Sequence, residues 1–480
     1  MSLHIGIDVG TTNVKTCIFD EKGELLATVS HITPVDHTEY GDLLNARQLW
    51  TIVKSSIKEV TTKCKGTELK SIGITSMGET IIPVDRNGPL WEGIMWYNPV
   101  TKTQYEQIID NINDRRIREL TGLTSSWFFS ASKIKYIKEL LPEIYERVEA
   151  FLDVSGFIAF MLTGNMKMDR TFASRLMLLD LKTGLWLDEL IEASNIDRSK
   201  LPELVWNNEP AGNLKVELIK EFGLDNSVSV TTAGQDHIAA AYAAGIVKQE
   251  QVLCSIGTSG AVFACADFNT LKSSRFIENQ FFSAGFHVLK GKYYLLEGTP
   301  TGGYCIDWFL KQVLNKNYDW LNNITLNKND VIFYPHLRNT LHGAALGKII
   351  NLSDKENADT LMQAIMEGVA FEVKRFIDRL VYIKSDQEVT EFVAVGGATS
   401  NNIFMKILAN VLGKPIKALE QAEFATNLGA AMISAVAINE ITNNYVLESV
   451  RKFKNTFYPD EGDIRMYYLE KYKKYLENER

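Results

Sequence analysis

The apolar positions along the chain alternate between helical spacing and short continuous runs. One apolar set at the spacing of helical turns comes before a strand-like stretch at 69–75, and it comprises Leu49, Ile52, Val53, Ile57 and Val60. A second set of this kind comes before an apolar run at 392–395, and it comprises Leu361, Ile365, Val369, Phe376 and Leu380. Apolar residues at helical spacing indicate one face of a helix, and short apolar runs are typical of buried strands. Helices that alternate with strands predict an α/β fold.

Two distant segments share one plan of apolar strand, Gly-Thr turn and second apolar strand. They span residues 5–20 and 252–267, and their offset of 247 residues pairs Gly10 with Gly257. A repeat at about half the chain length predicts two similar halves that face one another across a cleft. Two unrelated β-hairpins remain an alternative, because Gly-Thr turns are common.

The boundary between the halves is expected near residue 245, after an alanine-rich helix that begins around residue 237. This gives an N-terminal domain of residues 1–245 and a C-terminal domain of residues 246–480. We find no low-complexity linker at the boundary, and its absence indicates two halves in close contact.

The composition narrows the class of protein and of partner. Of the 480 residues, 45% are hydrophobic and 23% are charged, which is typical of a globular protein. Lys and Arg total 51 against 59 Asp and Glu, so the formal charge is −8, and we expect neither nucleic acid nor a membrane surface as the main partner. The longest apolar stretches, at 238–247 and 428–438, are shorter than the roughly 20 residues of a membrane span. We expect a cytoplasmic protein, because a strand pattern begins too early for a signal peptide. The sequence leaves both a monomer and a homodimer open.

The cysteines and histidines show no metal or disulfide pattern. The five cysteines are scattered without CxxC spacing: Cys17, Cys64, Cys254, Cys265 and Cys305. The seven histidines form no HExxH motif. We expect reduced thiols and no zinc site.

The two Gly-Thr turns are candidates for binding phosphate. Asp8-Val-Gly-Thr-Thr12 places a carboxylate at a strand end, followed by a tight turn with two hydroxyls. Backbone amides and hydroxyls of such a turn can bind phosphate, and the carboxylate can hold Mg²⁺. Gly257-Thr258-Ser259 supplies the same donors without the acid. A turn of this kind can also be purely structural, but the pair indicates a nucleotide–metal complex.

A third glycine-rich turn follows the strand predicted at 392–395. Gly396 and Gly397 precede a helix predicted at 403–412. Paired glycines at a helix N-terminus let a phosphate or a flat ligand approach the backbone. The alternative is a tight connecting turn, with Ser400 or Asn401 as the helix cap.

Acidic and aromatic residues suggest a site for a polyhydroxy substrate. Asp236 lies between a strand predicted at 228–232 and the alanine-rich helix, where it could be a general base or the helix N-cap. Glu79 follows a predicted strand in a non-helical stretch, and Trp96 adjoins Tyr97. Aromatic rings with neighbouring carboxylates suit neutral polyols, although the same rings could be ordinary packing residues.

Taken together and in this order, the segments resemble the FGGY carbohydrate kinases of the actin/hexokinase/Hsp70 superfamily. The resemblance covers residues 5–458 and rests on these segments: Asp8-x-Gly-Thr-Thr12, Gly73-Ile-Thr75, Asp153-x-x-Gly156, Leu162-Thr-Gly164, Gly234-x-Asp236, Ile256-Gly-Thr258, Glu367-Gly368 and Gly396-Gly-Ala398. It implies two actin-like, ribonuclease H-like α/β domains of mixed sheet flanked by helices, with a central cleft. It also implies ATP-dependent phosphorylation of a sugar hydroxyl, with Mg²⁺.

The resemblance also implies roles for individual residues. Asp236 would be the catalytic base, in place of the cap, and Asp8 would serve the metal. The implied nucleotide-binding residues are Gly10, Thr11, Thr12, Asn13, Gly257, Thr258, Gly303, Gly396, Gly397 and Asn401. The implied substrate-binding residues are Met77, Gly78, Glu79, Trp96, Phe128, Asp236 and His237.

The substrate segments depart from the patterns of the family's known members. Gly78 and Val100 stand where relatives have arginine, and Phe128 stands where glycerol kinases have tyrosine. The pocket should be roomier than a glycerol site, and a substrate carboxylate loses its obvious partners. We therefore expect a neutral five- or six-carbon sugar or polyol, with a ketopentose such as xylulose favoured. A gluconate or fuculose kinase is the alternative within the family, since Lys133 or His237 could supply a cation. An actin-like ATPase that drives a partner protein is the alternative of another class.

Overall fold

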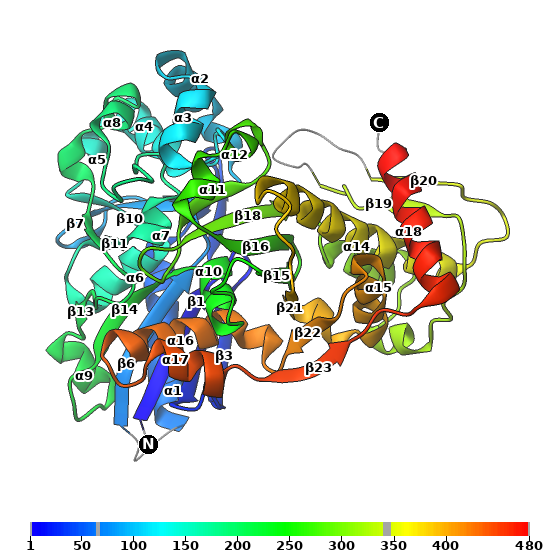
Figure 1. Ribbon diagram of the computed structural model, residues 1–480. Coiled ribbons are helices and arrows are strands. Elements are labelled where there is room, and N and C mark those ends of the chain that lie inside the picture. The colour runs from blue at the N-terminus through cyan, green and yellow to red at the C-terminus, as the bar shows by residue number, and fades with distance from the viewer. Residues whose placement is uncertain (1, 64–67, 339–346, 479–480) are drawn as a thin grey trace. The chain divides into compact units, whose positions relative to one another are not determined.

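The computed structural model of the protein describes residues 2–63, 68–338 and 347–478. Figure 1 labels many of its helices and strands. By compactness the chain divides into two units. Unit 1 comprises Met1–Val247, Ala266–Tyr294 and Phe424–Arg451, and unit 2 comprises Lys248–Cys265, Leu295–Glu423 and Lys452–Arg480. The domain boundary near residue 245 stays a prediction, because a compact unit can collect segments from several parts of the chain.

Unit 1 is built on a mixed six-stranded sheet. The strand order is β13-β14-β6-β1-β2-β3. The strands are β1 (Ser2–Val9), β2 (Asn13–Asp20), β3 (Leu25–Ile32), β6 (Glu68–Ser76), β13 (Gly212–Asn213) and β14 (Ser229–Gln235). β1, β6 and β14 run parallel to one another, whereas β2 is antiparallel to β1 and to β3. The carboxyl ends of the three parallel strands therefore meet at one edge of the sheet.

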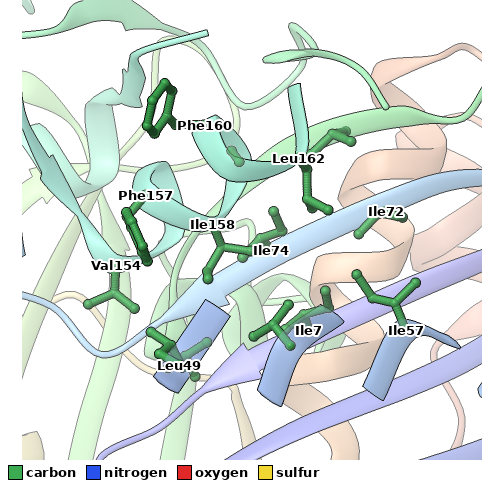
Figure 2. Close-up of a cluster of buried hydrophobic side chains, with 14 of the residues drawn as sticks. Ile7, Leu49, Ile57, Ile72, Ile74, Val154, Phe157, Ile158, Phe160 and Leu162 are labelled. Atoms are coloured by element: carbon green, nitrogen blue, oxygen red, sulfur yellow. The ribbon is translucent and has the colours of Figure 1, made fainter. Parts of the chain in front are cut away.

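One face of this sheet carries the main apolar core of unit 1. Helices α1 (Ala46–Lys63) and α6 (Val154–Thr163) contribute buried side chains to it. Figure 2 shows Ile7, Ile72 and Ile74 of β1 and β6 among leucine, isoleucine and phenylalanine side chains of the two helices. The side chains on alternate strand positions point to the same face, so one apolar face requires this spacing. The helix predicted from positions 49–60 and the strand predicted at 69–75 are confirmed.

The other face of the sheet is covered at close range by α16 (Ala425–Ala437). Gly6 of β1 and Gly73 of β6 are register partners. A Cβ atom on Gly6 would lie 1.9 Å from the carbonyl oxygen of Asn427, and one on Gly73 would lie 1.9 Å from that of Ala430. The two glycines thus let the helix backbone touch the sheet, where any side chain would clash.

The rest of unit 1 consists of smaller sheets and helices. A second sheet has the order β10-β7-β9-β5-β4 with β8 beside β7, and β11 pairs with β12. These and the remaining strand are β4 (Val35–Thr38), β5 (Gly41–Leu44), β7 (Ile81–Asp85), β8 (Gly88–Pro89), β9 (Gly93–Ile94), β10 (Ala150–Asp153), β11 (Lys167–Asp169), β12 (Glu203–Val205) and β17 (Ser283–Phe286). The helices are α2 (Lys102–Asn111), α3 (Asp114–Thr121), α4 (Ser130–Leu140), α5 (Pro142–Arg147), α7 (Arg170–Ala173), α8 (Asp188–Ala193), α9 (Val216–Phe222), α10 (Asp236–Ala243), α11 (Phe268–Lys272), α12 (Ser274–Glu278) and α17 (Asn443–Tyr445).

The sheet of unit 2 repeats the strand plan of unit 1. It contains, in order, β18-β16-β15-β21-β22-β23. The strands are β15 (Gln251–Ile256), β16 (Gly260–Ala266), β18 (Tyr293–Thr299), β21 (Glu391–Val395), β22 (Ile416–Leu419) and β23 (Phe453–Phe457). β15 forms an antiparallel hairpin with β16 and runs parallel to β21, just as β1 does with β2 and β6. The matching order favours the internal repeat over two unrelated hairpins.

Helices complete unit 2. They are α13 (Tyr304–Trp308), α14 (Ala358–Ile383), α15 (Asn402–Leu412) and α18 (Gly462–Glu477), and the small sheet is β19 (Ile332–Tyr334) with β20 (Lys348–Ile350). The predicted helical set at 361–380 lies in α14, and the helix predicted at 403–412 is α15, so both are confirmed.

Two sequence expectations concern the chain as a whole. Among the described residues, we find no helix long and apolar enough to cross a membrane. The described cysteines are buried, and no disulfide joins any two of them: Cys17, Cys254, Cys265 and Cys305. Cys64 lies outside the described residues. That these thiols are reduced in the protein stays a prediction.

Candidate functional site

Three acidic candidates of unit 1 lie at or just beyond the same edge of its sheet. Asp8 is near the end of β1, Glu79 follows β6, and Asp236 follows β14. Hydrogen bonds join these strand ends: the Met77 amide donates to the Val9 carbonyl at 2.9 Å. The Thr75 hydroxyl donates to the carbonyl of Gly234 at 2.6 Å. The carboxyl edge of an α/β sheet is where ligands commonly bind.

The first Gly-Thr turn, between β1 and β2, presents exposed polar groups. The Gly10 amide donates to the Asn13 carbonyl at 3.0 Å, and the Thr33 hydroxyl donates to the Gly10 carbonyl at 2.7 Å. These bonds fix the turn, while Thr12 and Asn13 remain exposed. Their side chains are thus open to a ligand.

Asp8 and Asp236 lie close enough for their charges to interact. Burial raises the pKa of Asp8 to about 8, and the negative charge of Asp236 adds to the increase. The Oδ1 atom of Asp8 is buried, with no hydrogen-bond partner among the described residues. A buried carboxylate oxygen without a donor is costly unless the group is protonated or meets a cation. The residue thus fits the Mg²⁺ role that the family resemblance implies.

Asp236 is the first residue of α10, and its side chain contacts the helix backbone. Its Oδ1 atom accepts a hydrogen bond from the His237 amide at 2.7 Å, while Gln235 occupies the N-cap position. The carboxylate therefore has a capping-type contact and is still within electrostatic range of Asp8. Asp236 and His237 are both half-buried. The cap and the base are not exclusive alternatives here.

Glu79 forms a buried ion pair with Arg175, which the sequence reading did not assign. The Arg175 Nε atom donates to Glu79 Oε1 at 2.5 Å, and each residue is 7% exposed. Glu79 has a φ of 60°, a left-handed conformation that is rare for a residue with a side chain. Its own carbonyl accepts a hydrogen bond from the Ser130 hydroxyl at 3.1 Å. The carboxylate is therefore fixed both by its charge partner and by its backbone.

The other substrate-binding candidates lie around this pair. A Cβ on Gly78 would lie 3.9 Å from Cγ of Arg175 and 3.4 Å from Cγ of Gln235. Phe128 is buried, with its ring centroid 4.2 Å from that of Phe129. The Arg175 guanidinium lies 5.1 Å from the Phe129 ring. Gly78, which stands where relatives have an arginine, therefore lies close to a different arginine, Arg175.

Two further candidates of unit 1 lie in packed surroundings. Met77 is buried in the apolar core. Trp96 is half-buried, and its indole donates to the Thr11 hydroxyl at 3.0 Å. Trp96, a substrate-binding candidate, is thus hydrogen-bonded to Thr11, a nucleotide-binding candidate.

The cation that we considered at Lys133 is deeply enclosed. Lys133 is fully buried, and its Nζ atom donates to the Phe128 carbonyl. Burial lowers the pKa of Lys133 to about 7, although the charge of Glu79 opposes the decrease. The ammonium is therefore readily neutralised near neutral pH.

The second Gly-Thr turn, in unit 2, is enclosed by glycines from two other segments. The Gly303 amide donates to the Gly257 carbonyl at 2.8 Å. A Cβ on Gly303 would lie 2.7 Å from that carbonyl oxygen, and one on Gly396 would lie 2.6 Å from the Ile256 oxygen. Gly396 also has a φ of +97°. The three predicted segments thus meet, and the close backbone approach explains why glycine occupies these positions.

Some residues around these glycines are exposed or have space beside them. Thr258 and its neighbour Ser259 are exposed, and no atom lies within 4 Å of a Cβ built on Gly397. Asn401 caps α15, because its Oδ1 atom accepts hydrogen bonds from two amides of the helix. Its Nδ2 atom is buried without a partner among the described residues. That donor therefore has no partner within the described part of the chain.

Comparison with known proteins identifies the class. The N-terminal domain model of the FGGY family of carbohydrate kinases matches residues 3–243, and the C-terminal domain model matches residues 252–438. The fold is that of a two-domain α/β phosphotransferase. The chain belongs to the FGGY family of carbohydrate kinases, which use ATP and an alcohol acceptor. This confirms the predicted family, fold class and enzyme class. The family membership favours a sugar kinase over the alternative of an actin-like ATPase that drives a partner protein.

The matching proteins include kinases named for xylulose, for glycerol and, among the solved structures, for gluconate. A xylulose kinase of Lactococcus lactis subsp. lactis is 27% identical over 453 residues, which is 91% of this chain and 88% of the relative. A glycerol kinase of Thermococcus gammatolerans is 28% identical and covers 97% of this chain and 95% of the relative. The crystal structure of Plasmodium falciparum glycerol kinase with ADP has a TM-score of 0.88 at 22% identity, over 99% of this chain and 98% of that one.

Sequence reasoning missed Arg175 and Gln235. The signal for Arg175 was a single charged residue directly before the apolar run 176–179. A charge in such a segment is expected to be buried and therefore paired. Its partner Glu79 is 96 residues away in the sequence, and no local pattern connects the two.

Proposed function

We propose that this kinase phosphorylates a hydroxyl of a neutral sugar or polyol of five or six carbons, with a ketopentose such as xylulose favoured. The observation that carries the proposal is the buried Glu79–Arg175 pair. Because Glu79 already compensates the charge of Arg175, a substrate carboxylate would have to displace Glu79 to gain an ionic partner. The named acceptors of the relatives, xylulose and glycerol, agree with a neutral acceptor.

The size of the acceptor follows from Gly78. A glycine leaves the space beside Arg175 and Gln235 free of a protein side chain. A longer carbon chain with more hydroxyls can then occupy it. Gluconate and fuculose kinases remain the alternatives within the family.

We assign the chemistry to Asp236. Its carboxylate accepts the proton of the attacking hydroxyl while the oxygen bonds to the γ-phosphorus of ATP and the bond to ADP breaks. The sugar phosphate, ADP and a protonated Asp236 result, and the proton then passes to solvent. Placement of the acid at a strand–helix junction next to Asp8 supports this role.

Asp8 would hold Mg²⁺, whose chemistry is to offset negative charge on the phosphoryl oxygens. The buried, unpartnered Oδ1 atom supports this assignment. With a cation present Asp8 would be ionised, because an adjacent positive charge lowers the pKa of a carboxyl group. Among the described residues, no cluster of three or more acidic, histidine or cysteine side chains offers an alternative metal site.

We assign nucleotide binding to the glycine-rich turns. In unit 2 the exposed Thr258 hydroxyl and the neighbouring amides would bind phosphate, while Gly397 and Asn401 would line the adenosine site. In unit 1 the exposed Thr12, between Gly10 and Asn13, would contact phosphate as well.

The proposal is tested with the purified protein, ATP and Mg²⁺ against a panel of acceptors. The panel contains pentoses, ketopentoses, hexoses, polyols, glycerol and sugar acids, and the readout is acceptor-dependent formation of ADP together with a phosphate ester detected by ³¹P NMR. We expect kcat/KM to be greatest for a neutral acceptor of five or six carbons. Turnover confined to sugar acids would contradict the proposal of a neutral acceptor. Turnover that is greatest with glycerol would contradict the proposal of an acceptor with five or six carbons.

A further inference from the structure

The carboxyl edge of the unit 1 sheet contains polar groups that neither the sequence motifs nor the proposed mechanism use. Gln235 ends β14 and is 5% exposed, and its Oε1 atom is buried with no hydrogen-bond partner among the described residues. Its Cγ atom lies 3.4 Å, and its Nε2 atom 3.9 Å, from the position of a Cβ on Gly78. A buried amide oxygen without a donor is destabilising, so we looked for a ligand that supplies one.

Arg175 lies near the same position. Its Cγ atom lies 3.9 Å from that Cβ position, and its guanidinium bonds to Glu79. A guanidinium has five N–H donors, more than Glu79 and the neighbouring Tyr294 hydroxyl accept. Gly78 thus lies beside the aliphatic stem of Arg175, whose guanidinium is rich in donors, and beside an amide with an unpartnered acceptor.

The chemistry of these groups matches adjacent hydroxyls. A sugar hydroxyl both donates and accepts, so one hydroxyl can donate to Gln235 Oε1 while its neighbour accepts from Arg175. Gln235 directly precedes Asp236, the proposed base. The hydroxyls that meet Gln235 and Arg175 are therefore near the one that is phosphorylated.

We propose that Gln235 and Arg175 are specificity-determining residues, which bind adjacent hydroxyls of the acceptor in the space left by Gly78. The inference rests on the proposed function, and it deepens that function by naming the residues that distinguish a polyhydroxy acceptor from its deoxy analogue. Arg175 then supplies the acceptor contacts of an arginine, which position 78 lacks. Its ion pair with Glu79 fixes the orientation of the guanidinium.

The test compares Gln235→Met with a matched control. Methionine has nearly the volume of glutamine without its polar atoms, so the variant removes the free acceptor and leaves no new buried polar group. Gln104→Met is the control, because Gln104 is also 5% exposed and also has a buried, unpartnered Oε1 atom, but it lies in α2 and bonds to Glu139. Arg175→Lys is the second test variant, since lysine keeps the charge for Glu79 but lacks the planar fork.

Each variant is assayed with the best acceptor of the wild-type protein and with deoxy analogues of that acceptor. We expect Gln235→Met to raise the acceptor KM about 3- to 12-fold, the range of a single neutral hydrogen bond. We expect Arg175→Lys to raise it about 10- to 100-fold, the range of a charged one. The KM for ATP and the melting temperature of Gln235→Met should stay near wild type. One deoxy analogue should discriminate strongly in wild type and only weakly in Gln235→Met.

Three results distinguish the possible failures. An unchanged acceptor KM and unchanged deoxy discrimination in Gln235→Met, with an active wild type, overturn this inference alone. An equal rise in acceptor KM in Gln104→Met also overturns it, because the effect would then be a general consequence of a lost buried amide. A wild-type protein that phosphorylates no sugar or polyol overturns the proposed function and this inference together.

Discussion

The raised pKa of Asp8 makes the stability of the metal-free protein depend on pH. The folded value is about 8, against an ordinary value of 3.8. A carboxyl group whose folded pKa is raised lowers the stability as pH increases, beginning at the unfolded value and ending at the folded one. The stability should therefore fall between about pH 4 and pH 8, by about 1.4 kcal/mol per pH unit. At pH 7 the accumulated cost is about 4 kcal/mol.

Asp8→Asn removes this cost, because the amide does not ionise. In EDTA the melting temperature of the variant should exceed that of wild type by a margin that grows from pH 5 to pH 8. At pH 8, Mg²⁺ should raise the melting temperature of wild type and leave that of Asp8→Asn unchanged, since a cation stabilises only a form that it binds. Thermal unfolding followed by circular dichroism at several pH values measures both effects.

Asp153→Asn is the matched control. Burial, together with the charge of Asp169, raises the pKa of Asp153 to about 8 as well. Asp153 caps α6 by accepting from the Gly156 amide, a bond that asparagine can keep. This variant should share the pH-dependent gain and retain the full response to Mg²⁺. A constant margin for Asp8→Asn at all pH values, or an unchanged Mg²⁺ response, would refute the reasoning for Asp8.

Further predictions test the acceptor space and the glycines. Gly78→Arg would place a second guanidinium beside Arg175, so the KM for a five-carbon acceptor should rise at least about tenfold, with relative activity shifted toward glycerol; an unchanged acceptor profile would contradict this. Gly6→Ala places a methyl group 1.9 Å from the Asn427 oxygen, and its melting temperature should fall sharply, because overpacking costs about 1–3 kcal/mol or more. Gly397→Ala meets no atom within 4 Å, so its melting temperature should match wild type while its KM for ATP rises. A stable Gly6→Ala, or a Gly397→Ala with normal ATP affinity, would oppose these assignments.

Much of the fold followed from local patterns. The Gly-Thr hairpins, the helices α1, α14 and α15 and the strand β21 lie where apolar spacing places them, because each signal is complete within one element. The convergence of Gly257, Gly303 and Gly396 was predicted only through the family resemblance. Spacing alone does not reveal it, since these glycines come from three separate segments.

The region around Gly78 could not be predicted from local sequence patterns alone. The absence of arginine at positions 78 and 100 was read correctly from the sequence, but it did not imply a region without arginine. Arg175 comes from the turn after α7, pairs with Glu79 and has its Cγ atom 3.9 Å from the position of a Cβ on Gly78. Likewise, no local motif could show that Asp236 lies within electrostatic range of Asp8, because the two residues come from distant segments.

The most direct test of the account is the acceptor-dependent turnover of Asp236→Asn with the best neutral acceptor. Asparagine keeps the size of the side chain and cannot accept the proton of the hydroxyl. We expect kcat to fall about 10²- to 10⁴-fold, the range of general-base catalysis. Turnover of Asp236→Asn near that of wild type would contradict the account.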